Sequence, residues 1–225
     1  MFKNRSRPLN PVVSALVLML AAAFTEAAAQ GPPLASSFPG PLWEVMTPTG
    51  GTVSVANAHL TINVPGGSNH DTLRPSNQSV RVVQPIGNEA FDVSIKIDSP
   101  VTAAEAGTSR GLMVIADPKD FVTFGLMTDG TNISLTANKV TGGVATTVFN
   151  LTSFNDYQNP ICLRLARNGN DYTAYYSADG TVWTQAASFT DTRVPTLIGP
   201  FAGNYSSIPG KAVPVVMAIN WFNVL

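Results

Sequence analysis

The carboxylates of this 225-residue chain are few and widely spaced. Hydrolysis of a glycosidic bond needs two carboxyl groups about 5 to 9.5 Å apart, one acting as acid and the other as nucleophile or base. Beyond the amino-terminal segment, the only glutamates are Glu44, Glu89 and Glu105, and none has a paired carboxylate nearby in sequence. Asp92 and Lys96 share the polar face of a predicted strand. The sequence therefore favours a protein without catalytic activity.

Histidine and cysteine are too sparse for a zinc site, which takes three or four ligands. The chain has two histidines, His59 and His70, and a single cysteine, Cys162. Cys162 has no disulfide partner, and we expect it to be a small residue packed in or near the core. His70 precedes Asp71, an arrangement that can provide a base with its orienting carboxylate. A solvent-exposed loop histidine is the favoured interpretation.

Calcium is the one metal that the sequence leaves open. It needs only oxygen ligands, which Asp117, Asp120 and Asp129 would supply together with backbone carbonyls. Their spacing matches no calcium-binding loop, and Asp129-Gly130 is explained by a turn. We therefore expect no cofactor.

An amide- and arginine-rich segment, Asn69 to Gln84, is the best candidate for ligand contacts. Carbohydrate recognition combines an aromatic ring against the sugar with polar groups that bind its hydroxyls. Alternation along residues 172–176 places at least one tyrosine on an outward face, whereas Trp183 and Trp221 are expected to pack within the sheets. The predicted ligand-binding residues are Arg74, Asn77, Arg81, Gln84, Tyr175, Asn204 and Tyr205.

The amino-terminal region has the three parts of a secretory signal peptide. Basic residues between positions 3 and 7 precede an apolar run from Val12 to Phe24, and three alanines end at Ala29. The run is 13 residues long, shorter than the ~20 that span a bilayer. We expect a cleaved signal peptide at 1–29 and a flexible leader at 30–37, in a bacterial protein secreted to the periplasm or the extracellular space with no membrane span after cleavage.

The mature chain of 225 minus 29, or 196, residues is the length of one domain, expected at 38–225. Removing three basic residues and Glu26 leaves 10 basic and 13 acidic side chains from the 13 and 14 of the whole chain, a net charge of −3. No basic stripe remains, so nucleic acid is not expected as a partner.

Short apolar runs separated by turn residues predict an all-β protein of about a dozen antiparallel strands in two packed sheets. Residues 161–185 are the clearest case, with three strands joined by tight turns at Asn168-Gly169 and Asp179-Gly180. The other expected strands are Thr52–Ala56, His59–Val64, Val80–Pro85, Phe91–Ile97, Gly111–Asp117, Asp120–Thr128, Asn132–Lys139, Val144–Leu151 and Ala212–Val224.

The two ends of the domain are expected to meet, which would leave neither terminal strand as a bare edge. The residues expected to pack together are Phe38, Leu42 and Trp43 near the start and Ile219, Trp221, Phe222 and Val224 at the end.

Several stretches resemble the concanavalin A-like jelly-roll domains of secreted bacterial proteins, in particular the β-sandwich module at the carboxyl end of bacterial β-xylosidases. They are RVVQ at 81–84, FDV at 91–93, GLMV at 111–114 with Asp117, DFVTFG at 120–125, LRL at 163–165, RNG at 167–169, TAYYSADG at 173–180 with Trp183, GPFAGN at 199–204 and WFNV at 221–224. The resemblance implies a two-sheet jelly-roll sandwich that binds its ligand on the concave sheet or at the rim of that sheet.

These observations lead to the prediction of a secreted, non-catalytic, lectin-like protein whose partner is a glycan or a cell-surface polysaccharide. Two alternatives stay open: a glycoside hydrolase or lyase with a non-standard site, and a structural or adhesion protein that uses the sandwich for protein contacts. Because one fold houses many functions, the fold does not choose among them.

Overall fold

The computed structural model describes residues 42–56, 59–154, 157 and 159–224. The predicted signal peptide and leader lie outside these residues. The described chain forms fourteen strands: β1 (Glu44–Met46), β2 (Thr52–Ala56), β3 (His59–Val64), β4 (Val80–Pro85), β5 (Phe91–Ile97), β6 (Thr108–Asp117), β7 (Asp120–Thr128), β8 (Ile133–Thr141), β9 (Val144–Leu151), β10 (Ile161–Asn168), β11 (Asp171–Ser177), β12 (Thr184–Thr190), β13 (Leu197–Asn204) and β14 (Val215–Val224).

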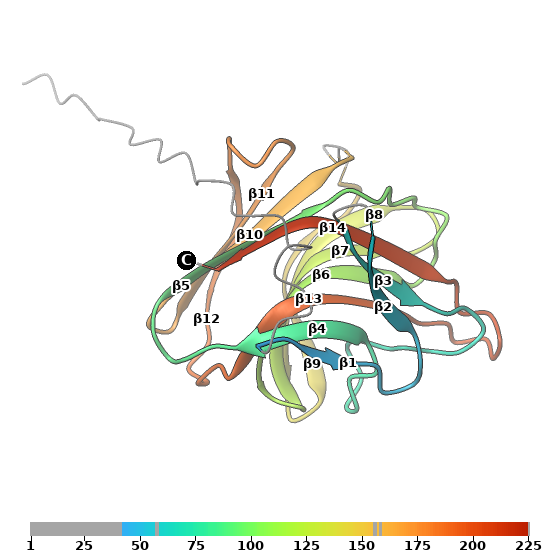
Figure 1. Ribbon diagram of the computed structural model, residues 1–225, viewed down its shortest axis with the longest axis horizontal. Helices are drawn as coiled ribbons and strands as arrows, with labels where there is room; N and C mark the ends of the chain where they lie inside the picture. The colour runs from blue at the N-terminus through green and yellow to red at the C-terminus, as the bar shows by residue number, and fades with distance from the viewer. Residues whose placement is uncertain (1–41, 57–58, 155–156, 158, 225) are drawn as a thin grey trace, which may run out of the picture.

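The strands form two seven-stranded sheets packed face to face (Figure 1). Sheet I has the order β1-β4-β13-β6-β7-β8-β9, and sheet II has the order β12-β11-β10-β5-β14-β3-β2. Neighbouring strands pair antiparallel throughout. The predicted two-sheet jelly-roll sandwich is confirmed.

The main core lies between the sheets because alternate residues of each strand point inward. In β5, Phe91, Val93, Ile95 and Ile97 are buried, whereas Asp92, on the opposite face, is partly exposed. Buried residues of β3, β4, β6, β7, β8, β10, β11, β13 and β14 belong to the same cluster. The alternation predicted for this segment is confirmed.

A second apolar cluster lies on the outer face of sheet I. It consists of Val83, Met113, Ile115, Phe121, Val140 and Phe201, with Met46, Leu73 and Leu197 packed against it. Because β6 is a central strand covered on both faces, eight of its ten residues are buried.

The β3–β4 loop, residues 65–79, covers part of this outer face. Leu73 packs on the second cluster, the Thr72 Oγ1 lies 2.9 Å from the Ser109 Oγ, and the Asn77 Nδ2 donates to the Met113 Sδ at 3.3 Å. The cavity left between Leu73 and Phe201 is about 10 Å³, room for about one water molecule. On a bare sheet this face would be available to a ligand, but here the chain fills it with its own loop.

The two ends of the domain meet as predicted. The ring of Trp43 packs edge to face on Phe222, with centroids 5.2 Å apart. Phe38 lies outside the described residues. The terminal segments are not paired with each other as strands, however, because β1 pairs with β4 and β14 lies between β5 and β3.

Several predicted boundaries need correction. The tight turn predicted at Gly169 is confirmed. The tight turn predicted at Gly180 is wrong, because residues 178–183 form a longer loop and β12 begins only at Thr184. The Asp179 side chain stabilises that loop by accepting hydrogen bonds from the Thr181 and Val182 N–H groups. Strands β1 and β13 were not predicted, and β6, β8 and β14 start or end two or three residues from their expected limits.

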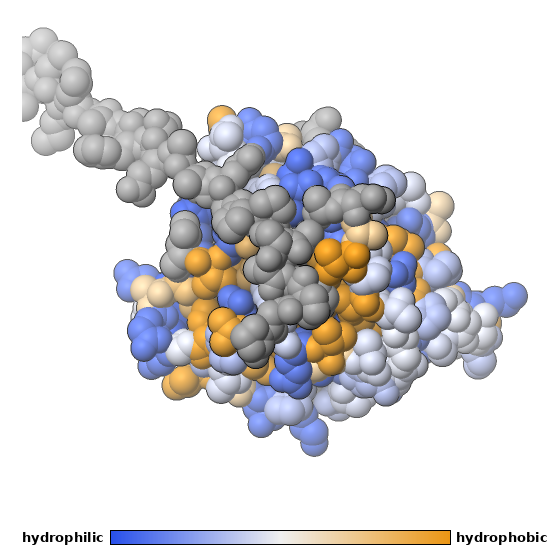
Figure 2. All heavy atoms as spheres, viewed as in Figure 1, coloured by the Kyte–Doolittle hydropathy of each residue, from blue (hydrophilic) through white to orange (hydrophobic). Residues whose placement is uncertain are grey.

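The surface is mixed in polarity. Figure 2 shows polar side chains around the periphery of the viewed face and apolar ones nearer its centre. Exposed apolar side chains include Leu42, Val144, Val182 and Val216, and scattered apolar residues of this kind are normal on folded proteins. No helix with the length and apolarity to cross a bilayer occurs in the described part of the chain.

Candidate functional site

His70 and Asn204 join the β3–β4 loop to the end of β13. The His70 N–H donates to the backbone oxygen and to the side-chain Oδ1 of Asn204, both at 2.9 Å. The His70 Nδ1 lies 3.1 Å from the Ser68 oxygen and 3.2 Å from the Asn204 Oδ1. Both neighbours are acceptors, so Nδ1 carries the hydrogen. His70 is fully buried, and its interpretation as a solvent-exposed loop histidine is wrong.

Asn204 has a structural role like that of His70. Its Nδ2 donates to the Pro65 and Val213 carbonyl oxygens at 2.9 and 2.7 Å, and the residue is buried. Each polar atom of the side chain is therefore occupied within the protein, and Asn204 supports the adjacent surface without facing it.

Asn77 and Arg81 also point inward. Asn77 is buried, with a backbone φ of 32°, and its Oδ1 accepts from the Ser79 hydroxyl at 2.7 Å. The Arg81 Nη1 donates to the backbone oxygens of Asn77 and Ser79 at 3.1 and 3.0 Å. Burial lowers the pKa of Arg81. The expectation that these two side chains line an open rim is wrong, because both are buried where the β3–β4 loop packs on the sheet.

Gln84 and Tyr175 lie apart from the other predicted residues. Gln84 is half-buried near the end of β4. Tyr175 lies on the outer face of sheet II, and the guanidinium carbon of Arg164 is 5.2 Å from its ring centroid. The structure therefore does not assemble the seven predicted residues into one site.

Arg74 and Tyr205, in contrast, are brought into contact. The Arg74 Nη2 donates to the Tyr205 hydroxyl at 2.9 Å, and the guanidinium carbon lies 5.0 Å from the centroid of the ring. The Arg74 Nε donates to the Asp71 Oδ2 at 3.1 Å. The electrostatic interaction with Tyr205, and then the hydrogen bond and charge of Asp71, raise the pKa of Arg74. The side chain is 60% exposed, and its Nη1 has no hydrogen-bond acceptor among the described residues.

Tyr205 forms one wall of an open depression of about 400 Å³, a size within the range of small-molecule sites. We call it the Tyr205 depression. Two of its lining residues are held together, because the Asn69 Nδ2 donates to the Ser206 oxygen at 3.0 Å and the Asn69 Oδ1 accepts from the Ser206 N–H at 2.8 Å. The residues that line it are Gly67, Ser68, Asn69, Tyr205, Ser206, Ser207, Pro209 and Gly210.

The chemistry of the Tyr205 depression is that of a polar, uncharged pocket with a cation at its edge. Serine hydroxyls donate and accept hydrogen bonds, the tyrosine ring offers an apolar surface, and Arg74 supplies further N–H donors. Such a set matches a ligand with many hydroxyl groups and C–H faces. The residues that line the depression include no carboxylate and no histidine.

The carboxylates considered for calcium are engaged in local hydrogen bonds. The Asp117 Oδ1 accepts from the Lys119 N–H at 3.1 Å, and the Asp129 Oδ1 accepts from the Asn132 N–H at 2.7 Å. These backbone donors lower the pKa of Asp129. Among the described residues no group of three or more His, Cys, Asp or Glu side chains is arranged to hold a metal.

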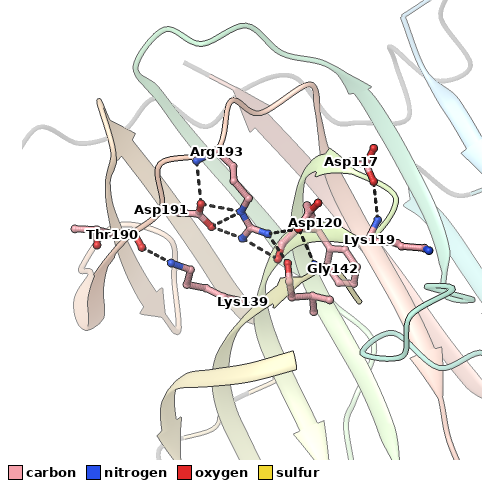
Figure 3. A network of polar contacts seen from close by, with 10 residues as sticks. Asp117, Lys119, Asp120, Lys139, Gly142, Thr190, Asp191 and Arg193 are labelled. Carbon is pink, nitrogen blue, oxygen red and sulfur yellow. Dashed lines mark hydrogen bonds and ion pairs between the residues drawn. The ribbon is translucent and has the colours of Figure 1, made fainter. Parts of the chain in front are cut away.

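Asp120 belongs to a network that links the sheets at one end (Figure 3). The Arg193 Nε donates to both carboxylate oxygens of Asp191, at 2.8 and 3.1 Å, and the Arg193 Nη1 lies 3.4 Å from the Asp120 Oδ1. Lys139 donates to the Thr190 oxygen at 2.6 Å. Burial opposes ionisation of Asp191, but the hydrogen bonds from Arg193 outweigh it and lower the pKa. The network ties the end of β12 to β7 and β8, and its groups are satisfied by one another.

Sequence reasoning missed two contributors to the surface. The Ser206–Gly210 segment lines the Tyr205 depression, and its Ser, Pro and Gly composition is a loop signal that carries no ligand specificity. Arg164 lies between Tyr175 and Trp183, 5.7 Å from the Trp183 ring centroid, and pairs with Asp92. Trp183 is half-buried just before β12, so its expected packing within a sheet is only partly correct, whereas Trp221 is buried in β14.

The fold is similar to several solved structures. A functionally unknown protein from Saccharomyces cerevisiae matches with a TM-score of 0.64 at 14% identity, over 81% of this chain and 94% of that one. The GH43 BlXynB protein from Bacillus licheniformis matches with a TM-score of 0.64 at 16% identity, over 83% of this chain and 37% of that one. Xylan β-1,4-xylosidase from Bacillus halodurans C-125 matches with a TM-score of 0.57 at 14% identity, over 75% and 33%.

This chain therefore spans about a third of the length of the two Bacillus proteins. At such low identities the similarity shows a shared β-sandwich fold. No protein-family model and no curated protein sequence matches the chain.

Proposed function

We propose that this protein is a secreted, non-catalytic β-sandwich that binds a glycan or a cell-surface polysaccharide in the Tyr205 depression. The observation that carries the proposal is the contact between Arg74 and Tyr205 at the edge of a hydroxyl-lined depression. Arg74 is held in place by Asp71 before any ligand arrives, so little side-chain entropy is lost when its remaining N–H groups bind hydroxyls.

The structural neighbours support a link to carbohydrate-active proteins, because they include GH43 and xylosidase chains. Since this chain covers about a third of each, we propose that it corresponds to a β-sandwich module of the kind found at the carboxyl end of β-xylosidases. We propose that this sandwich holds the polysaccharide while another protein or domain performs the cleavage.

A glycan array with the mature protein, repeated with calcium and with a chelator, tests the proposal. A saccharide that binds is then titrated against wild type, Arg74→Ala and Tyr205→Ala. Loss of a charge-assisted hydrogen bond predicts about a tenfold weaker affinity for Arg74→Ala. Lys119→Ala is the control, because Lys119 is an exposed loop cation remote in sequence from the Tyr205 depression, and its affinity should equal that of wild type.

The outcomes separate the alternatives. Binding that is lost with the chelator would add a metal that the proposal does not include. The absence of any saccharide signal under both conditions would overturn the proposal. It would favour a structural or adhesion protein that makes protein contacts, or an enzyme. Binding that is unchanged in both Tyr205 depression variants would leave a lectin but move its site.

A further inference from the structure

A second depression lies on sheet II, at the connection between β11 and β12. It is about 310 Å³ in volume, at the low end of the range for small-molecule sites and adequate for a single sugar ring. We call it the Asp179 depression. Its lining residues, Ile161, Tyr176, Ser177, Ala178, Asp179, Val182 and Thr184, share no member with the Tyr205 depression.

One oxygen of Asp179 is fixed by the loop that it organises. The Oδ1 atom accepts from the Thr181 N–H at 2.8 Å, the Val182 N–H at 3.0 Å and the Ser177 hydroxyl at 2.9 Å. These hydrogen bonds, that of the Thr181 N–H most of all, lower the pKa of Asp179 well below its usual range. The side chain is therefore a rigid, ionised carboxylate.

The other oxygen of Asp179 is available. The Oδ2 atom accepts none of these three hydrogen bonds. The Thr181 side chain also interacts with the carboxylate and lowers its pKa, but no Lys, Arg or His among the described residues forms an ion pair with Asp179. Two other carboxylates of this region are paired, Asp92 with Arg164 and Asp98 with Lys96 and His59, whereas the exposed Asp171 at the start of β11 lines neither depression. The depression thus presents a negative charge that the described protein does not neutralise.

Apolar groups flank this charge. Ala178 is exposed and Val182 is 74% exposed, whereas Ile161 lines the depression from the buried core. The Tyr176 ring is held edge to face by Phe154, with centroids 4.9 Å apart. Thr184 is exposed. A carboxylate beside apolar and aromatic surface suits a ligand that has a cationic amine and a C–H face.

We propose that the Asp179 depression binds a protonated amino sugar, with the ammonium group on the Asp179 Oδ2 and the C–H face of the ring against Val182 and Tyr176. This site rests on the proposed function only in taking a sugar as its ligand. It would give the protein two separate sugar sites of different charge, one bordered by the Arg74 cation and one containing the Asp179 anion. Two sites on one sandwich raise the avidity for a polymer above that of either site.

Asp179→Asn is the decisive variant, because an asparagine Oδ1 still accepts the three hydrogen bonds of the loop while the charge is removed. The matched control is Asp129→Asn. Asp129 also organises a turn, with its Oδ1 accepting from the Thr131 and Asn132 N–H groups at 2.8 and 2.7 Å, but it lines neither depression. Val182→Arg is a second variant, at an exposed position where folding should be unaffected, and it brings a repelling charge.

The full-length mature protein is titrated with a glucosamine tetrasaccharide and with its fully N-acetylated counterpart, at about pH 5.5, where amine and carboxylate are both charged. We expect Asp179→Asn and Val182→Arg to bind the glucosamine oligomer about three- to fivefold more weakly, the size of an exposed ion pair. Asp129→Asn should match wild type. Wild type should prefer the free amine over the N-acetylated oligomer by a similar factor, and added salt should reduce the preference.

Equal binding of the two oligomers by wild type, or unchanged binding by both Asp179 depression variants, would overturn the proposal. Weaker binding only in Arg74→Ala would place the sugar in the Tyr205 depression, which overturns this second site and supports the first. Weaker binding only in Asp179→Asn and Val182→Arg supports the second site, even if the Tyr205 depression binds nothing.

Discussion

Trp43 and Phe222 meet edge to face with ring centroids 5.2 Å apart, although 179 positions separate them in the chain. Trp43 precedes β1 of sheet I, and Phe222 belongs to β14 of sheet II. Their contact therefore joins the start of the described chain to its end and couples the two sheets.

Removing this contact should destabilise the sandwich. Phe222 is 93% buried, so Phe222→Ala should lower the free energy of unfolding by about 3 kcal/mol. A double-mutant cycle with Trp43→Ala should give a coupling energy of about 0.5 to 1.5 kcal/mol, measured by denaturant unfolding. Val216→Ala, at an exposed position of the same strand, should change stability by less than about 0.5 kcal/mol. Additive effects of the two aromatic substitutions would show that the rings do not support each other.

The Asp191–Arg193 pair should make stability depend on pH. The folded-state pKa of Asp191 is lowered, so its contribution is fully present above the unfolded value of about 3.9 and is lost as pH falls through the lower folded value. Asp191→Asn should cost about 1 to 3 kcal/mol at pH 7, and the difference from wild type should shrink in acid. Thermal unfolding between about pH 2 and 7 measures this.

Asp171→Asn provides the comparison for that experiment. Asp171 is an exposed carboxylate at the start of β11 with no ion pair to any described residue, and its substitution should be nearly neutral across the same pH range. A constant difference between Asp191→Asn and wild type at every pH would refute the assigned titration.

The packing of the β3–β4 loop against the β8–β9 turn can be tested at the two glycines of that turn. Both have positive φ, 56° at Gly142 and 83° at Gly143. A Cβ at Gly142 would meet nothing, whereas one at Gly143 would lie 2.7 Å from the Pro75 Cα. Gly142→Ala should cost about 1 kcal/mol from backbone strain alone. Gly143→Ala should cost roughly 1 to 3 kcal/mol more because it displaces the loop.

Denaturant unfolding of the two variants gives the difference directly, since the backbone strain is similar in both. Equal stability would mean that the loop moves away from Gly143 at no cost. In that case the outer face of sheet I would be more accessible than its packing indicates.

Cys162 should be unreactive while the protein is folded. It is fully buried, and burial raises the pKa of its thiol to about 12, so both access and thiolate are lacking at neutral pH. A thiol reagent should label it only after unfolding in guanidinium chloride, with one thiol per chain. Rapid labelling of the native protein would contradict the burial of β10 against its neighbours.

Most strands could be predicted because the alternation of apolar and polar residues that marks a strand lies within the strand's own few residues. FDVSIKI has the two-residue period of a strand with one apolar face, and it forms β5 with the predicted limits. Strand β13 was missed because LIGPFAGN contains glycine and proline, which normally interrupt strands. It pairs with β4 and β6 in sheet I, and its glycine has a packing role there, because a Cβ at Gly199 would lie 2.0 Å from the Val82 oxygen.

The sequence by itself determined the strand periodicity, the fold class and the chemistry available along the chain. Only the tertiary structure decided which polar residues reach the surface. Arg74, Asn77 and Arg81 are polar residues of one short segment, yet Arg74 is exposed and stacks on Tyr205 whereas Asn77 and Arg81 are buried. The difference arises because the β3–β4 loop buries Leu73 on the second apolar cluster. That burial depends on strands that are distant in sequence, so no local pattern records it.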